Sequence, residues 1–231
     1  MFLLNKKRIL FILSTIILGI SLYSPITSIE TVSIPVSGHT IIVDAGHGLP
    51  DAGASSDDGT SEENINLNIS LKLQKLLEAS GSTVILTRSD ENGIYEVNSK
   101  NKKQSDLKNR VNLANSSNAE IFVSVHLNKI DISSCSGWQS FYQKNNENSK
   151  ILAKCIQENL NYSIQKNNKR DILPLSGKYI IDNIKIPTVI IECGFLSNPS
   201  ELNNLKTDSY QDNLAWGIYT GIIDYFSNSM L

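Results

Sequence analysis

The stretch Thr40-Ile41-Ile42-Val43-Asp44-Ala45-Gly46-His47-Gly48 decides how this chain folds. A short apolar, β-branched run that stops at a glycine-rich loop is typical of a buried strand. Apolar runs of the same kind return at residues 83–86, 121–125 and 188–191, with a further candidate at 138–142. Apolar residues at helical spacing separate them at 65–77, 107–114 and 151–160, and a last helix is predicted at 214–225. Strands that alternate with helices predict an α/β fold, a single domain with a mostly parallel twisted sheet flanked by helices.

The chain has 231 residues and three predicted parts. Residues 1–25 carry the basic patch Lys6-Lys7-Arg8 and then a charge-free apolar run, which is typical of a signal peptide or signal anchor. The run is shorter than the ~20 residues of a full membrane span. We favour an uncleaved anchor, because Pro25 obstructs cleavage after Ser24. Residues 26–37 are predicted to be a linker and residues 38–231 the folded domain, placed outside the cytoplasm by the positive-inside rule.

The composition argues against a disulfide-dependent fold and against a nucleic-acid-binding protein. Hydrophobic residues make up 40% of the chain, so a core can form without disulfides. The formal net charge of −2 argues against a nucleic-acid partner. Cys135, Cys155 and Cys193 form no metal-binding cluster, and their disulfide state is left open.

Ionisable residues follow three of the predicted strands. His47 comes shortly after the first, His126 directly follows Val125, and Glu192 directly follows Ile191. In α/β sheets ligands gather beyond the carboxyl ends of the strands, so these three side chains are expected to converge. An ionisable group beside a buried run is costly unless it is paired or bound to a metal.

A catalytic zinc site with two histidine ligands usually has a third protein ligand, often a glutamate. Glu62 and Glu63 are both candidates, because both precede the helix at 65–77. Thr60 and Glu63 have the spacing of a capping box, which leaves Glu62 as the freer acid. Asp44 is expected either to orient a metal ligand or to hold the glycine-rich loop. His39 lies at the opposite end of its strand, and we assign it no role.

Five segments together resemble a known family. They are IIVDAGHGLPDAGA (41–54), SEENINL (61–67), LKNRVNLAN (107–115) with its arginine, IFVSVHLN (121–128) and VIIECGFLSN (189–198). In order and spacing they resemble the zinc N-acetylmuramoyl-L-alanine amidases of the third amidase family.

The resemblance implies a phosphorylase/hydrolase-like catalytic amidase domain with one Zn²⁺. It implies that His47, Glu62 and His126 bind the zinc and that Glu192 is the catalytic acid and base. Glu63 departs from the family, many of whose members carry lysine there. A short chain without wall-binding repeats resembles the spore-cortex subgroup, which prepares muramic acid for lactam formation.

The expected reaction is hydrolysis of the amide between N-acetylmuramic acid and L-alanine in peptidoglycan. Two alternatives stay open: a zinc peptidase acting on a peptide bond, and a catalytically silent peptidoglycan-binding module. Asn128, expected in a loop after His126, is assigned to substrate binding or to a turn. Arg110 is predicted either to bind a carboxylate of the stem peptide or to form an ion pair on the helix surface. The expected partners are peptidoglycan and, if the leader is uncleaved, the membrane, while no activator protein can be identified.

Overall fold

The computed structural model describes residues 5–6, 9–11, 13–15, 34–164 and 168–229. The chain divides into two units, Met1–Ser33 and Ile34–Leu231. The predicted leader at 1–25 lies largely outside the described residues, as does the predicted linker as far as residue 33. None of the helices in the described ranges is long and apolar enough to cross a membrane. The second unit begins with a turn in which Val36 is fully buried.

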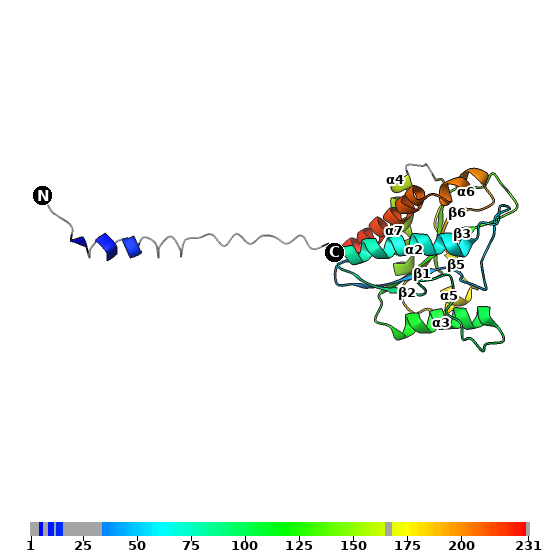
Figure 1. The fold of residues 1–231 in the computed structure, drawn as a ribbon, viewed down its shortest axis with the longest axis horizontal. Coiled ribbons are helices and arrows are strands. Elements are labelled where there is room, and N and C mark those ends of the chain that lie inside the picture. The colour runs from blue at the N-terminus through cyan, green and yellow to red at the C-terminus, as the bar shows by residue number, and fades with distance from the viewer. Residues whose placement is uncertain (1–4, 7–8, 12, 16–33, 165–167, 230–231) are drawn as a thin grey trace. The chain divides into compact units, whose positions relative to one another are not determined.

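A six-stranded sheet forms the centre of the second unit, in the order β2-β1-β3-β6-β4-β5 (Figure 1). Its strands are β1 Thr40–Ala45, β2 Thr83–Leu86, β3 Ile121–Asn128, β4 Gln139–Gln143, β5 Leu173–Leu175 and β6 Thr188–Phe195. Neighbours β2, β1, β3 and β6 are parallel, and only the β4–β6 pairing is antiparallel. The predicted single α/β domain with a mostly parallel sheet is confirmed.

Helices cover both faces of the sheet (Figure 1). They are α2 Glu62–Ala79, α3 Lys102–Ser116, α4 Glu147–Ile164, α5 Tyr179–Asn183, α6 Pro199–Leu205 and α7 Asp208–Ser229. The larger core lies between the sheet and α2, α4 and α7, and a smaller one lies between the sheet and α3 and α5. Alternate residues of β1 and β3 point to the two cores, which is why each strand contains a continuous apolar run, Ile41–Val43 and Ile121–Val123.

Three short elements were missing from the prediction. β5, α5 and α6 are too short to show a period in the sequence, and β5 contains Pro174. β3 and β6 are also longer than predicted, because pairing continues past His126 and Glu192. All three cysteines are free, and Cys193 is fully buried in the larger core.

Candidate metal and catalytic site

Four predicted residues meet at the carboxyl edge of the sheet. His126 of β3 and Glu192 of β6 are direct register partners, so their side chains emerge on the same face. His47 stands in the loop after β1, and Glu62 is the first residue of α2. The parallel arrangement of β1, β3 and β6 is what brings residues so distant in sequence to one edge.

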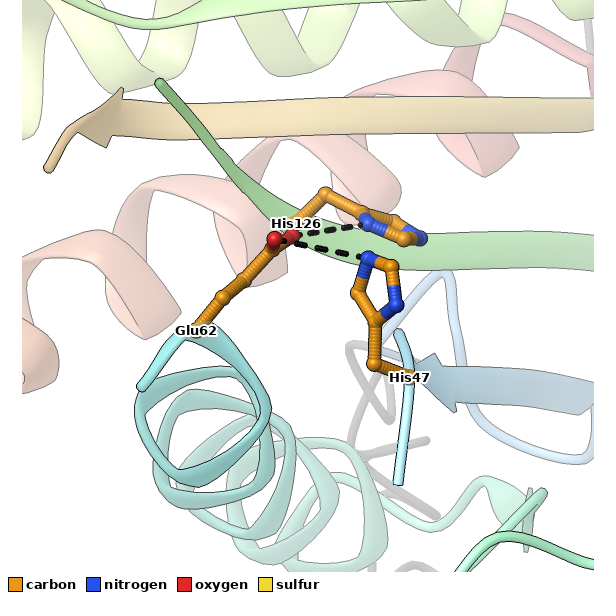
Figure 2. A group of neighbouring side chains, drawn as sticks. All are labelled: His47, Glu62 and His126. Carbon is orange, nitrogen blue, oxygen red and sulfur yellow. Dashed lines mark hydrogen bonds and ion pairs between the residues drawn. The ribbon is translucent and has the colours of Figure 1, made fainter. Parts of the chain in front are cut away.

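His47, Glu62 and His126 point toward one another (Figure 2). His47 Nε2 lies 3.4 Å from Glu62 Oε2, and His126 Nδ1 lies 3.0 Å from Glu62 Oε1. One ligand atom from each residue falls within 4.8 Å of the others, so the three side chains form a group that can hold a metal ion. Two imidazoles and a carboxylate are a donor set that metal ions such as zinc accept.

The Glu62 carboxylate is held in place by the backbone. It is 3% exposed and accepts hydrogen bonds from the amides of Ala54 at 2.8 Å and Leu127 at 3.0 Å. Burial alone would raise its pKa, but His126 and His47 outweigh this and hold the pKa of Glu62 far below its usual range. The carboxylate is therefore ionised, as a metal ligand must be.

Glu63 does not form the predicted capping box. Ser61, and not Thr60, is the N-cap residue of α2, and its side chain makes no capping hydrogen bond. The Ser61 hydroxyl instead donates to Glu63 Oε1, while the Thr60 hydroxyl donates to Asp58. The helix thus begins one residue later than the spacing suggested, which turns Glu62 toward the histidines.

The loop that carries His47 is held by two buried arginines. Arg110 donates to the carbonyls of Ala45 and His47, and Arg88 donates to those of Ala45 and Gly46. His47 has a φ of 62°, a left-handed conformation that a residue with a side chain rarely adopts. The arginines fix the carbonyls on both sides of this strained residue.

Arg110 therefore has neither of its two predicted roles. It is 1% exposed, so it lies neither on the helix surface nor within reach of a substrate carboxylate. Its guanidinium pairs with Asp44 and Asp106 inside the domain. Arg110 shares a helical face with Leu107, Val111 and Ala114, and only its charge suggested the surface.

Asp44 acts on the loop and on His47 through Arg110, and among the described residues its side chain bonds to no candidate metal ligand. It is 1% exposed and accepts hydrogen bonds from Arg110, Thr87 and Ser124. Burial alone would raise the pKa of Asp44, but Arg110 and the Ser124 hydroxyl lower it. An ionised Asp44 keeps Arg110 aimed at the loop.

Glu192 lies beside the three candidate ligands without bonding to them. Its Oε2 atom is buried and finds no hydrogen-bond partner among the described residues. Burial raises the pKa of Glu192, and the nearby Glu62 charge raises it further, although His126 opposes both. A buried carboxyl with an unsatisfied oxygen is suited to exchange protons near neutral pH.

Asp51 is a neighbour of the site to which we assigned no role from the sequence. Its Oδ2 lies 3.2 Å from His47 Nδ1 and 3.0 Å from Lys103 Nζ. Burial alone would lower the pKa of His47, but Glu62 and Asp51 raise it. In the sequence, the indication of this contact was that Asp51 follows His47 by four residues in the same glycine-rich loop.

Asn128 lies differently from expectation, whereas His39 lies at the end of its strand that the sequence predicted. Asn128 is the last residue of β3 and not part of a loop, and its carbonyl accepts a hydrogen bond from Leu196 at 2.8 Å. His39 stacks on Phe226 with ring centroids 4.0 Å apart and lies 2.9 Å from Glu120. It is a packing histidine at the other end of β1, as the sequence indicated.

Gly46 leaves the space that the His126 ring occupies. A Cβ atom on Gly46 would lie 2.4 Å from His126 Cε1 and Nε2. We predict that Gly46→Ala displaces this imidazole and weakens metal binding by about 10–100-fold, as loss of a supporting contact does. Elemental analysis measures the bound metal, and His126→Ala provides a reference for loss of a candidate ligand.

The melting temperature of Gly46→Ala in chelator should stay close to that of the wild type, because the clash involves only a side chain at the sheet edge. A variant that melts normally and binds metal as tightly as the wild type would show that His126 does not need this position.

Comparison with known proteins assigns the family. Residues 41–224 match the sequence model of the N-acetylmuramoyl-L-alanine amidase family. The germination-specific N-acetylmuramoyl-L-alanine amidase of Bacillus subtilis is 40% identical over 199 residues, which cover 84% of this chain and 83% of that protein. The B. subtilis amidase LytC is 34% identical, with 83% of this chain and 36% of LytC covered.

Solved structures agree. The CwlD amidase of Clostridioides difficile, determined in complex with the GerS lipoprotein, is 46% identical with a TM-score of 0.80. The match covers 82% of this chain and 99% of that one. This chain therefore belongs to the third family of N-acetylmuramoyl-L-alanine amidases, enzymes that act on peptidoglycan.

Proposed function

We propose that the chain is a zinc-dependent amidase that hydrolyses the amide between the lactyl group of N-acetylmuramic acid and L-alanine. His47, Glu62 and His126 are the proposed zinc ligands, and Glu192 is the proposed acid and base. The observation that carries the proposal is the convergence of two imidazoles and an ionised carboxylate within 4.8 Å, next to a buried carboxyl oxygen without a partner.

The types of ligand atom, and the groups that hold the ligands in place, are both suited to zinc. Nitrogen and carboxylate ligands with one position left for water are typical of catalytic zinc sites. Backbone amides orient Glu62, and Asp51 lies against the outer nitrogen of His47, as groups behind a metal ligand commonly do. When bound, zinc lowers the pKa of a water molecule and polarises the carbonyl of the amide.

Glu192 performs the proton transfers in this proposal. As a carboxylate it accepts a proton from the attacking water, and as an acid it delivers that proton to the leaving nitrogen of L-alanine. The products are a muramyl carboxylate and a peptide with a free amino terminus. Burial raises the pKa of Glu192, which makes its carboxylate a better proton acceptor than an ordinary glutamate.

We predict that Glu192→Gln retains the metal and the fold but loses turnover by about 10²–10⁴-fold, the usual contribution of a positioned general acid and base. Metal content, melting temperature and release of L-alanine amino termini from purified muropeptides are measured on one preparation. An active, zinc-loaded Glu192→Gln enzyme would refute the proposed mechanism.

Glu201 offers a matched control. It is a buried acid whose carboxylate accepts hydrogen bonds from the amides of Gly137 and Phe195. Glu201→Gln should lower the melting temperature while turnover per folded molecule is kept. The same product analysis separates the amidase from the two alternatives, since a peptidase releases other amino termini and a silent binding module releases none.

We also propose a role in the spore cortex. The likeness to a germination-specific amidase of B. subtilis, at matching length, supports this assignment. If the amidase prepares muramic acid for lactam formation, spores of a strain that lacks it should contain no muramic lactam. Muropeptide analysis of such spores measures this, and a normal lactam content would contradict the role.

We propose that residues 1–25 carry the enzyme across the membrane and anchor it there. The basis is the basic patch followed by a charge-free apolar run. External protease should digest the domain in intact, wall-stripped cells, and the enzyme should stay with the membrane fraction. Full protection of the domain in a cell with one membrane would contradict export.

A further inference from the structure

A groove runs from the candidate site along the face of the sheet that α3 and α5 cover. It has a volume of about 380 Å³, and His47, His126 and Glu192 line it at one end. Its walls are formed by apolar side chains from α3, α5 and three strands, namely Leu107, Phe141, Leu175, Ile180 and Ile190. Because Glu192 lines this groove, a substrate whose scissile amide reaches Glu192 can extend one of its two halves into it.

The chemistry of the walls favours the peptide half. An N-acetylated sugar carries hydroxyl and amide groups, which lose hydrogen bonds when they are buried against apolar side chains. The methyl group of L-alanine has no such cost. An extended peptide advances about 3.3–3.6 Å per residue, so the residue after L-alanine lies farther along the groove, away from Glu192.

Lys178 is the one cation among the residues that line this groove. Its side chain is exposed, and within the described part of the chain it has neither an ion pair nor a hydrogen bond. Its charge nevertheless reaches the site, where it acts to lower the pKa of Glu192. A cation without a protein partner beside an apolar groove is available to an anionic group of a ligand.

The lysines on the other side of His47 are already engaged. A second hollow of about 270 Å³ there is lined by Asp51, Tyr95, Lys102 and Lys103. Lys103 pairs with Asp51 at 3.0 Å, and Lys102 lies over the Tyr95 ring, 4.7 Å from its centroid. The two hollows thus differ in one respect. Each lysine of the second hollow contacts an acid or an aromatic ring, whereas the Lys178 side chain contacts neither among the residues that the structure describes.

We propose that the α3–α5 groove takes the peptide half of the substrate and that Lys178 binds the carboxylate of the residue that follows L-alanine. This inference rests on the proposed amidase function and adds its substrate specificity. Lys178 is a specificity residue here, because it contacts a part of the substrate that does not react.

Two synthetic substrates test the proposal on the full-length enzyme. Both are N-acetylmuramoyl-L-alanyl peptides, and they differ in whether the residue after L-alanine has a free or an amidated carboxylate. The wild type should prefer the free carboxylate by on the order of 10-fold in kcat/KM, the worth of a charge-assisted hydrogen bond at an exposed site. Lys178→Met should abolish this preference by raising KM for the free carboxylate alone, and any change in kcat that follows from the pKa of Glu192 should be the same for both substrates.

Two further variants serve as controls. Lys178→Arg retains the charge and should retain the preference, and raised salt should reduce the preference of the wild type, because the pair is exposed. Lys102→Met removes a lysine from the other hollow and should leave the preference intact.

Three outcomes would overturn the inference. A preference that survives in Lys178→Met places the carboxylate elsewhere, and loss of the preference in Lys102→Met places the peptide in the other hollow. An equal loss with both substrates would mean that Lys178 acts on Glu192 or on the muramyl carboxylate product. Failure of the amidase proposal itself would look different, since the wild type would then release neither peptide.

Discussion

The buried ion pair between Asp44 and Arg110 is the interaction on which the site depends. Both residues are 1% exposed, and ionised groups withdrawn from water are tolerated only when they are paired and hydrogen-bonded. Thr87 and Ser124 supply further hydrogen bonds to Asp44, and Asp106 supplies another partner for Arg110. Nη1 and Nη2 of Arg110 also donate hydrogen bonds to the carbonyls of Ala45 and His47, at the end of β1 and in the loop that follows it.

This pair links the fold to the geometry of His47. A left-handed conformation at a residue with a side chain costs on the order of 1–3 kcal/mol and persists only where the surroundings impose it. Here Arg110 binds the carbonyl of His47 itself, and Arg88 binds the carbonyl before it. Since Asp44 belongs to β1, the orientation of the loop is set by the strand from which the loop emerges. A substitution at Arg110 would therefore disturb the candidate metal site, although Arg110 reaches His47 only at its backbone carbonyl.

The parts of the structure that sequence can predict are those in which one residue's neighbours in the chain decide its environment. Apolar runs before His47, His126 and Glu192 indicate buried strands, and the topology of parallel sheets then brings their ends together. The helical period places Arg110 on an apolar face, but the partner that makes burial of its charge tolerable is Asp44, which is far away in the chain and not visible locally. The choice between Glu62 and Glu63 turns on a shift of one residue in the start of α2, which spacing cannot resolve. β5 and α5, which form the far wall of the groove, are too short for any period to reveal them.

Glu62 and Glu192 lie on different faces of the sheet, and their surroundings differ accordingly. Glu62 reaches the sheet edge from α2, on the side of the larger core, and its charge is stabilised there by backbone amides and two imidazoles. Glu192 points to the side of α3 and α5, where the walls are apolar and its Oε2 has no partner. The same residue type is thus kept ionised in one place and made harder to ionise in the other. A metal ligand must stay deprotonated, whereas a proton carrier must change state in each cycle, and the different surroundings of the two carboxylates suit the roles that we propose for Glu62 and Glu192.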